Sequence, residues 1–512
     1  MSDGSKQTVA DVMSRPVVTA VSGETVAEAA SRMRERHVGS VVVVDGDVPV
    51  GILTERDLVR LSADGADPST DRVADWMTPD PDSVPSDADA AAAFTSLAER
   101  GYRHIPVVDD KVLVGLVSMR DLMRIAAIQP ADTIASDIPR GLEGVAVAET
   151  TIGDVRGFEG FYHYRQYDAV ELAEKRTLED AWYLLFDGEL PTLDERNRFL
   201  DEVRPLREIP AALAPVLPEI ARLGTDAPPL DLLRTTVSLM AAALGFRPSL
   251  DVDRVELRAD GLRVCAVVPT LLASIHRLQR GLQPIPPHPE LPYAANYLYM
   301  LNDKVPLPEH ARAIEQYLIS TIDHGFNAST FTARVITSTG ADLGAAVVGA
   351  IGALSGPLHG GAPSRALAML DAIGTPEQAE AYLREQVSSG QRLMGFGHRV
   401  YKTDDPRSVM LRGIAERLGG EQVEFAKQVE RTAVDVLGEL KPGRRLYTNV
   451  EFYAGVVMST CGLPREMFTP TFASSRMVGW CAHVLEQAAD NRLIRPSASY
   501  VGPPPPQPVP EI

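Results

Sequence analysis

Residues 395–407 form a segment, GFGHRVYKTDDPR, whose residue types suit acid–base chemistry on an anionic substrate. His398 is the residue type that best donates or accepts a proton near neutral pH. Lys402 and Arg407 can hold anions on either side of it, Arg407 in a bidentate fork that suits a carboxylate. Gly395 and Gly397 let the backbone approach a ligand closely. The segment predicts a proton donor among anion clamps, although glycine-rich turns with a histidine also occur as plain loops.

Three further segments in this half of the chain carry groups that could act with this loop. DHGFNASTFTAR contains His324, GPLHGGAP holds His359 between a proline turn and paired glycines, and NVEFY contains Glu451. Arg476 and Arg495 follow closer to the C-terminus. Such a set suits carbanion chemistry, which needs a base, an oxyanion donor, an acid and carboxylate clamps.

Other chemistries fit these residues less well. Each histidine taken alone is also compatible with a purely structural role. The chain contains no HExxH motif or close His/Asp/Glu cluster, which argues against a metal site. It also lacks the G-x-S-x-G segment of a serine hydrolase elbow. We therefore expect neither a metal nor a redox cofactor.

The composition is that of a globular protein. Of 512 residues, 45% are hydrophobic and 23% are charged. The formal net charge of −19 argues against nucleic acid and anionic membranes as partners. Cys265, Cys461 and Cys481 form neither a disulfide framework nor a zinc pattern. The N-terminus lacks the apolar stretch of a signal peptide, so we expect a soluble cytoplasmic protein.

The first quarter of the chain is an internal repeat with an offset of 64 residues. The segment VADVM, which begins at Val9, recurs as VADWM at Val73, and GILTERD at Gly51 recurs as GLVSMRD at Gly115. Strands are expected at 40–44 and 105–108, each followed by an acidic turn, a second strand and a helix. Because one copy is too small to bury both faces of its sheet, we expect the two copies to pack together.

This region, residues 5–127, resembles a tandem pair of CBS domains, also called a Bateman module. In that family the Gly-x-x-Thr/Ser-x-x-Asp segment binds adenosyl ligands, with the hydroxyl on the phosphate and the Asp on the ribose. The resemblance implies Thr54 with Asp57 and Ser118 with Asp121 as nucleotide-binding residues. A hydroxyl at a helix N-terminus suits a phosphate. The same spacing is also a plain capping arrangement, so both interpretations stay open.

The remainder of the chain is expected to be mostly helical. Residues 128–139 predict a short linker and residues 502–512 a proline-rich tail. Apolar residues at three- and four-residue spacing predict helices, which prolines are expected to end. Short strands are expected at 141–149 and 151–155, and helices at 178–186, 230–244, 264–282 and 343–354.

Taken in order, the motifs of residues 140–501 resemble citrate synthase. That family condenses acetyl-CoA with oxaloacetate to give citrate and CoA. Its fold is almost wholly helical, with a large and a small domain that close over the substrates, and it acts as a dimer or a multiple of dimers with shared active sites. We therefore expect a multidomain protein in which an α/β CBS-domain pair precedes a mostly α-helical citrate-synthase fold.

The resemblance implies a role for each motif residue. His359 would stabilise the enol, Glu451 would take the methyl proton and His398 would protonate the oxaloacetate carbonyl. The other residues would hold the substrates: His324, Arg407 and Arg476 the oxaloacetate, Arg495 the same molecule from the partner subunit, and Lys402 the phosphate of CoA.

Two features depart from the family pattern and leave alternatives open. Glu451 stands where the family usually has Asp; the extra methylene moves the carboxylate by roughly 1.5 Å, and such a misplacement could cost about 100-fold in rate. Residues 164–167 read YRQY where RGY is common. The alternatives are a 2-methylcitrate synthase that uses propionyl-CoA and a non-catalytic sensor of CoA esters or dicarboxylates. The repeat would modulate activity through an adenine nucleotide.

Overall fold

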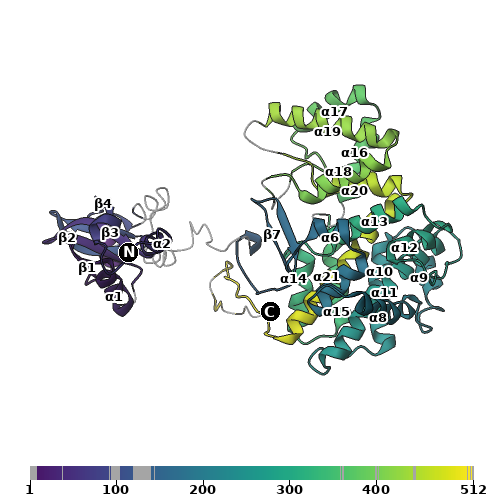
Figure 1. Cartoon of the computed structure of the whole chain (residues 1–512), viewed down its shortest axis with the longest axis horizontal. Helices are drawn as coiled ribbons and strands as arrows, with labels where there is room; N and C mark the ends of the chain where they lie inside the picture. Colours follow the sequence, from purple (N-terminus) through teal and green to yellow (C-terminus); the bar gives the residue numbers. More distant parts are fainter. Residues whose placement is uncertain are drawn as a thin grey trace. The chain divides into compact units, whose positions relative to one another are not determined.

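The computed structural model describes residues 8–36, 38–90, 93, 104–118, 140–142, 144–357, 359, 362–397, 401, 403–441, 446–503, 505–507 and 509. The chain divides into two compact units, Met1–Val147 and Ala148–Ile512 (Figure 1). The helix expected after Ser118 and the predicted linker at 128–139 lie outside the described residues.

Unit 1 contains the repeat. Its first copy forms a sheet in the order β1-β2-β3-β4, in which β1 runs parallel to β2 and the other pairs are antiparallel. The second copy contributes an antiparallel pair, β5 and β6. The predicted strands and the helix after Thr54 are confirmed. The elements are β1 (Thr19–Ala20), α1 (Val26–Arg36), β2 (Ser40–Asp45), β3 (Val48–Thr54), α2 (Glu55–Ala63), α3 (Val73–Trp76), β4 (Thr78–Pro79), β5 (His104–Asp109) and β6 (Val112–Ser118).

The two copies exchange their VAD-x-M segments. Met13 of the first copy is buried in the core of the second, and Met77 of the second packs on the core of the first. Each methionine lies against the glycine of the other copy's Gly-x-x-Thr/Ser segment, so a Cβ at Gly51 would clash with Met77 and one at Gly115 with Met13. The expectation that the copies pack together is therefore confirmed.

Unit 2 is mostly helical and has two lobes (Figure 1). We call the helices α16–α20, which pack on one another, the small lobe, and the rest of unit 2 the large lobe. A three-stranded antiparallel sheet, β7-β8-β9, begins the large lobe. Its elements are β7 (Gly153–Arg156), β8 (Phe161–Tyr164), β9 (Tyr167–Asp168), α6 (Ala169–Lys175), α7 (Leu178–Asp187), α8 (Leu193–Val203), α9 (Leu217–Leu223), α10 (Pro229–Leu244), α11 (Arg254–Gln279), α12 (Tyr293–Asn302), α13 (Pro308–Thr321), α14 (Ala328–Ser338), α15 (Leu343–Leu354) and α21 (Phe468–Ala489). The small lobe contains α16 (Ala362–Ile373), α17 (Pro376–Ser388), α18 (Pro406–Leu418), α19 (Glu421–Leu440) and α20 (Val450–Thr460).

Local sequence explains where these helices begin. Pro229, Pro308, Pro376 and Pro406 occupy the first turn of α10, α13, α17 and α18, where the missing N–H costs no hydrogen bond. Proline, which we expected at helix ends, therefore also marks helix starts in this chain. The strand expected at 141–149 is wrong, because residues 140–142 form a 3-10 turn and 144–150 no regular element.

The core of unit 2 is built around α11 and α21, which contact each other and most of whose residues are buried. α11 begins ten residues before the predicted helix at 264 and continues through Pro269. It is the one described helix long and apolar enough to cross a membrane, and 89% of its apolar window is buried inside the protein. α15 packs closely on α10 and α14, as its small residues predicted.

Candidate active site

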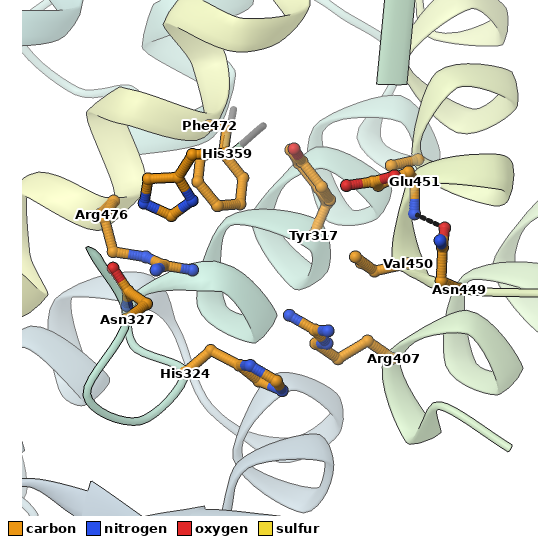
Figure 2. A pocket seen from close by; sticks show the side chains of 11 residues that line it. Tyr317, His324, Asn327, His359, Arg407, Asn449, Val450, Glu451, Phe472 and Arg476 are labelled. Atoms are coloured by element: carbon orange, nitrogen blue, oxygen red, sulfur yellow. Dashed lines mark hydrogen bonds between the residues drawn. The ribbon is translucent and has the colours of Figure 1, made fainter. Parts of the chain in front are cut away.

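A pocket of about 180 Å³ lies between the two lobes of unit 2 (Figure 2). The large lobe provides side chains from α13, α21, the loop between α13 and α14 and the loop that follows α15, and the small lobe provides the starts of α18 and α20. The lining residues are Tyr317, His324, Asn327, His359, Arg407, Asn449, Val450, Glu451, Ala454, Phe472 and Arg476.

Five of the predicted site residues meet in this pocket. Figure 2 shows the side chains of His324, His359, Arg407, Glu451 and Arg476 around a common space. They come from positions as far apart in the chain as His324 and Arg476, so the fold brings them together. Arg495 is exposed and does not line the pocket. His398 and Lys402 lie outside the described residues.

The backbone that leads to His398 is tied to the start of α20. The Gly397 N–H donates to the Tyr447 carbonyl (2.8 Å), and the Asn449 N–H donates to the Gly395 carbonyl (2.9 Å). The Asn449 side-chain amide also donates to the Gly397 carbonyl (3.0 Å). The close approach that Gly395 permits is to Phe452, because a Cβ at Gly395 would lie 2.9 Å from the Phe452 Cβ. The packing on Phe452 is thus a structural reason for glycine at position 395.

A Gly395→Ala substitution is expected to destabilise the small lobe and lower activity. Gly395 has a φ of +87°, which costs an L-residue about 1–2 kcal/mol, and the contact with Phe452 adds roughly 1–3 kcal/mol of overpacking. Gly390→Ala is the matched control, since φ is +78° and nothing lies within 4 Å of its Cβ position. Thermal unfolding should show a larger decrease in Tm for Gly395→Ala than for Gly390→Ala. Equal decreases in Tm would contradict the packing argument.

Glu451 is placed as a candidate base. It lies in the first turn of α20, where Asn449 Oδ1 caps the helix by accepting from the Glu451 N–H (3.1 Å). Burial raises the pKa of Glu451 to about 7, although Arg407 opposes this rise. A carboxyl group with a pKa near neutrality can take a proton in one step and return it in the next.

His359 is placed as a neutral hydrogen-bond donor. Burial and the nearby Arg476 lower its pKa to about 4, so the ring carries no charge at pH 7. Its Nε2 atom accepts from the Ser329 N–H (3.4 Å) and lies 2.8 Å from the Ser329 hydroxyl. In a neutral imidazole one ring nitrogen carries a proton and can donate it to a substrate oxygen.

The two arginines of the pocket are fixed by different partners. Arg407 donates through Nε and Nη2 to both carboxylate oxygens of Asp405, at 3.0 and 2.8 Å. Asp405 also accepts from the Val450 N–H (3.1 Å) and thereby joins the starts of α18 and α20. Arg476 donates from Nε to the Thr321 carbonyl (2.8 Å). Its Cζ atom lies over the Phe472 ring, 4.6 Å from the ring centre. Both guanidinium groups are held for an anion without the entropy cost of ordering a free side chain.

Sequence reasoning missed several residues of the site. Asn327 and Asn449 line the pocket and cap α14 and α20, and an Asn directly before an apolar helical segment was the available signal. Phe472 lies four residues before Arg476 on one helix face, which helical spacing could have revealed. No local pattern pointed to Asp405 as the partner of Arg407.

Of the residues predicted to bind a nucleotide, Thr54 and Asp57 form a capping arrangement. The Thr54 N–H and hydroxyl both donate to Asp57 Oδ2, at 2.9 and 2.8 Å. Ser118 ends β6, and Asp121 lies outside the described residues. In the described parts of the chain, no group of three or more His, Cys, Asp or Glu side chains could hold a metal ion.

The structure combines a pair of α/β repeats with a two-lobed helical domain that has a pocket between its lobes. The family model "Citrate synthase, C-terminal domain" matches residues 141–497, and the CBS-domain model matches 9–64 and 73–128. The chain belongs to the citrate synthase family. It is a citrate synthase-type enzyme with N-terminal tandem CBS domains.

Curated relatives and solved structures agree. Citrate synthase from Deinococcus radiodurans is 40% identical over 372 residues, which cover 72% of this chain and 96% of the relative. Citrate synthase from Haloferax volcanii is 40% identical over 375 residues, 72% of this chain and 97% of the relative. A structure from Thermoplasma acidophilum, a ternary complex with carboxymethyl coenzyme A and oxaloacetate, has a TM-score of 0.67 at 31% identity and covers 73% of this chain and 98% of its own.

Proposed function

We propose that the pocket between the lobes condenses acetyl-CoA with oxaloacetate to give citrate and CoA. The observation that carries this proposal is the combination, in one pocket, of a carboxyl group of raised pKa, a neutral histidine and two buried arginines. Such a set serves proton abstraction from a thioester methyl group while a dicarboxylate is held beside it.

The proposed steps use these side chains in turn. Glu451 takes a proton from the methyl group while the neutral ring of His359 donates a hydrogen bond to the thioester oxygen, which stabilises the enol. The enol carbon attacks the oxaloacetate carbonyl, and His398 gives its proton to the oxygen as the C–C bond forms. Water then cleaves citryl-CoA to citrate and CoA. The substrate oxygens are held by His324, Arg407 and Arg476, and by Arg495 of a second copy in a dimer; Lys402 holds CoA.

The preference between acyl donors decides the particular substrate. Acetyl-CoA and propionyl-CoA differ by one methylene, which a pocket discriminates by about 10- to 200-fold. The test is kcat/KM for both thioesters with oxaloacetate, and a clear preference for propionyl-CoA would make the protein a 2-methylcitrate synthase. No turnover with either thioester would favour a sensor.

The rate should rise with pH through the pKa of Glu451. Because the base must be ionised and burial raises its pKa from about 4.5 to about 7, kcat/KM should fall about tenfold for each pH unit below 7 and level off above it. Steady-state rates between pH 5 and 9 measure this. A profile that is flat from pH 7.5 down to pH 5 would contradict the raised pKa.

We also propose that the CBS pair modulates the enzyme through an adenine nucleotide. The support is the chain path: unit 1 ends at Val147, and β7 begins at Gly153. The β7–β8 turn reaches the loop that precedes Arg407, since a Cβ at Gly160 would lie 2.7 Å from Thr403 Oγ1. Calorimetry with ATP, ADP, AMP and S-adenosylmethionine tests binding, and kinetics of a chain without residues 1–127 test regulation. No binding of any of the four, or unchanged kinetics, would remove this proposal.

A further inference from the structure

Two tyrosines outside the predicted site surround the guanidinium group of Arg407. Tyr162 lies on β8 of the large lobe, and Tyr401 lies on the loop before α18 of the small lobe. The Arg407 Cζ atom is 5.9 Å from the centre of each ring. Both tyrosines are buried, with exposed fractions of 1% and 4%. Desolvated cation–π contacts of this kind are stronger than those at the surface.

The same two rings contact His324. The Tyr401 hydroxyl lies 2.9 Å from His324 Nε2, and the two ring centres are 5.4 Å apart. The ring of Tyr162 is 5.5 Å from that of His324, and its hydroxyl donates to the Ser320 carbonyl (3.1 Å). The imidazole is therefore packed against two rings and hydrogen-bonded to one of them, which fixes its rotation.

The contact between Tyr401 and His324 also joins the two lobes. His324 follows α13 of the large lobe, whereas Tyr401 and Arg407 belong to the small-lobe segment that enters α18. Burial raises the pKa of Tyr401 well above its ordinary value, so its hydroxyl keeps its proton throughout the working pH range. Tyr401 contacts both His324 and Arg407 and thus sets the distance between these two side chains, which are proposed to hold the oxygens of the substrate.

We propose that Tyr401 and Tyr162 are positioning residues that hold the two side chains responsible for binding the dicarboxylate substrate. This inference rests on the proposed function. Tyr401 acts through its hydroxyl, which orients His324. Tyr162 acts through its ring face, which supports Arg407 from the large-lobe side. The affinity for oxaloacetate, rather than the chemical step, should depend on both residues.

Tyr401→Phe removes a single oxygen and tests whether the Tyr401 hydroxyl orients His324. It is expected to raise KM and Kd for oxaloacetate by about three- to tenfold, the worth of one hydrogen bond. Its kcat should stay within about twofold and its KM for acetyl-CoA unchanged, since a lost positioning contact acts on ground-state binding. Tyr297→Phe is the matched control, because Tyr297 is buried and loses a hydrogen bond to Thr471 (3.0 Å) away from the pocket. It should lower Tm without changing KM.

Two substitutions of Tyr162 separate the effect of its ring from the effect of its hydroxyl. Tyr162→Phe keeps the ring and should leave KM for oxaloacetate within about twofold, whereas Tyr162→Leu should raise it by about tenfold. If Tyr401→Phe and the Tyr162 variants bind oxaloacetate as the unmodified protein does, the inference is wrong. Calorimetric Kd values keep the two proposals apart, because they measure oxaloacetate binding even if the unmodified protein releases no CoA. Absence of CoA release overturns the proposed function instead.

Discussion

Replacing Glu451 by glutamine is expected to lower kcat by about 100- to 10,000-fold, the usual contribution of a general base. Glutamine keeps the size of the side chain and the first turn of α20 but cannot accept the methyl proton. KM for oxaloacetate should change little, because the proposed contacts to oxaloacetate come from other residues. Stopped-flow or steady-state release of CoA measures the loss. A kcat within tenfold of the unmodified enzyme would show that another group is the base.

Glu451→Asp tests the extra methylene separately. The backbone of α20 is fixed by the Asn449 cap and by the Val450 N–H bond to Asp405. An aspartate there would withdraw the carboxylate by roughly 1.5 Å, and a displacement of that size costs about 100-fold in kcat. An aspartate variant as fast as the glutamate enzyme would mean that the helix shifts to compensate.

Replacing Arg407 by leucine is expected to damage stability and activity together. The pair with Asp405 is almost fully buried, with side-chain exposures of 4% and 1%. Removing one partner leaves a buried charge and costs roughly 3–5 kcal/mol of stability. Loss of the carboxylate contact should lower kcat/KM for oxaloacetate by about 100- to 1,000-fold. Thermal unfolding and steady-state kinetics measure the two effects.

The double substitution Arg407→Leu/Asp405→Asn separates these effects. It removes the uncompensated charge, and the amide oxygen can still accept from one of the two backbone N–H groups, of residue 407 or of Val450, that bond to the carboxylate of Asp405. Stability should recover by more than half, whereas kcat/KM should not. Recovery of both stability and kcat/KM would show that Arg407 acts only on folding. Recovery of neither would show that Arg407 and Asp405 do not stabilise the fold as an ion pair.

Much of the fold was predictable because its signals are local. The 64-residue repeat predicted two α/β copies that pack together. Apolar spacing predicted the helices α7, α10 and α15 almost to their ends. Pro269 lies inside α11, where burial in the core outweighs the weak helix propensity of proline. The strand expected at 141–149 failed because no strand among the described residues pairs with this segment; the sheet begins only at Gly153.

The site residues were predictable where the residue type and its motif indicate a chemical role. His359, Glu451 and the arginines could be chosen because they stand in motifs that resemble those of the family. Their partners could not, since Asp405, Tyr401 and Tyr162 resemble ordinary capping and core residues until the lobes pack. The raised pKa of Glu451 likewise depends on burial, which a local motif does not encode.

Release of CoA from acetyl-CoA, with and without oxaloacetate, tests the account most directly. The full-length protein should release CoA and citrate in equal amounts, only when oxaloacetate is present, and the Glu451→Gln variant should be slower by at least about 100-fold. No release by the full-length protein, or release at the same rate without oxaloacetate, would contradict the proposal that this pocket carries out the condensation.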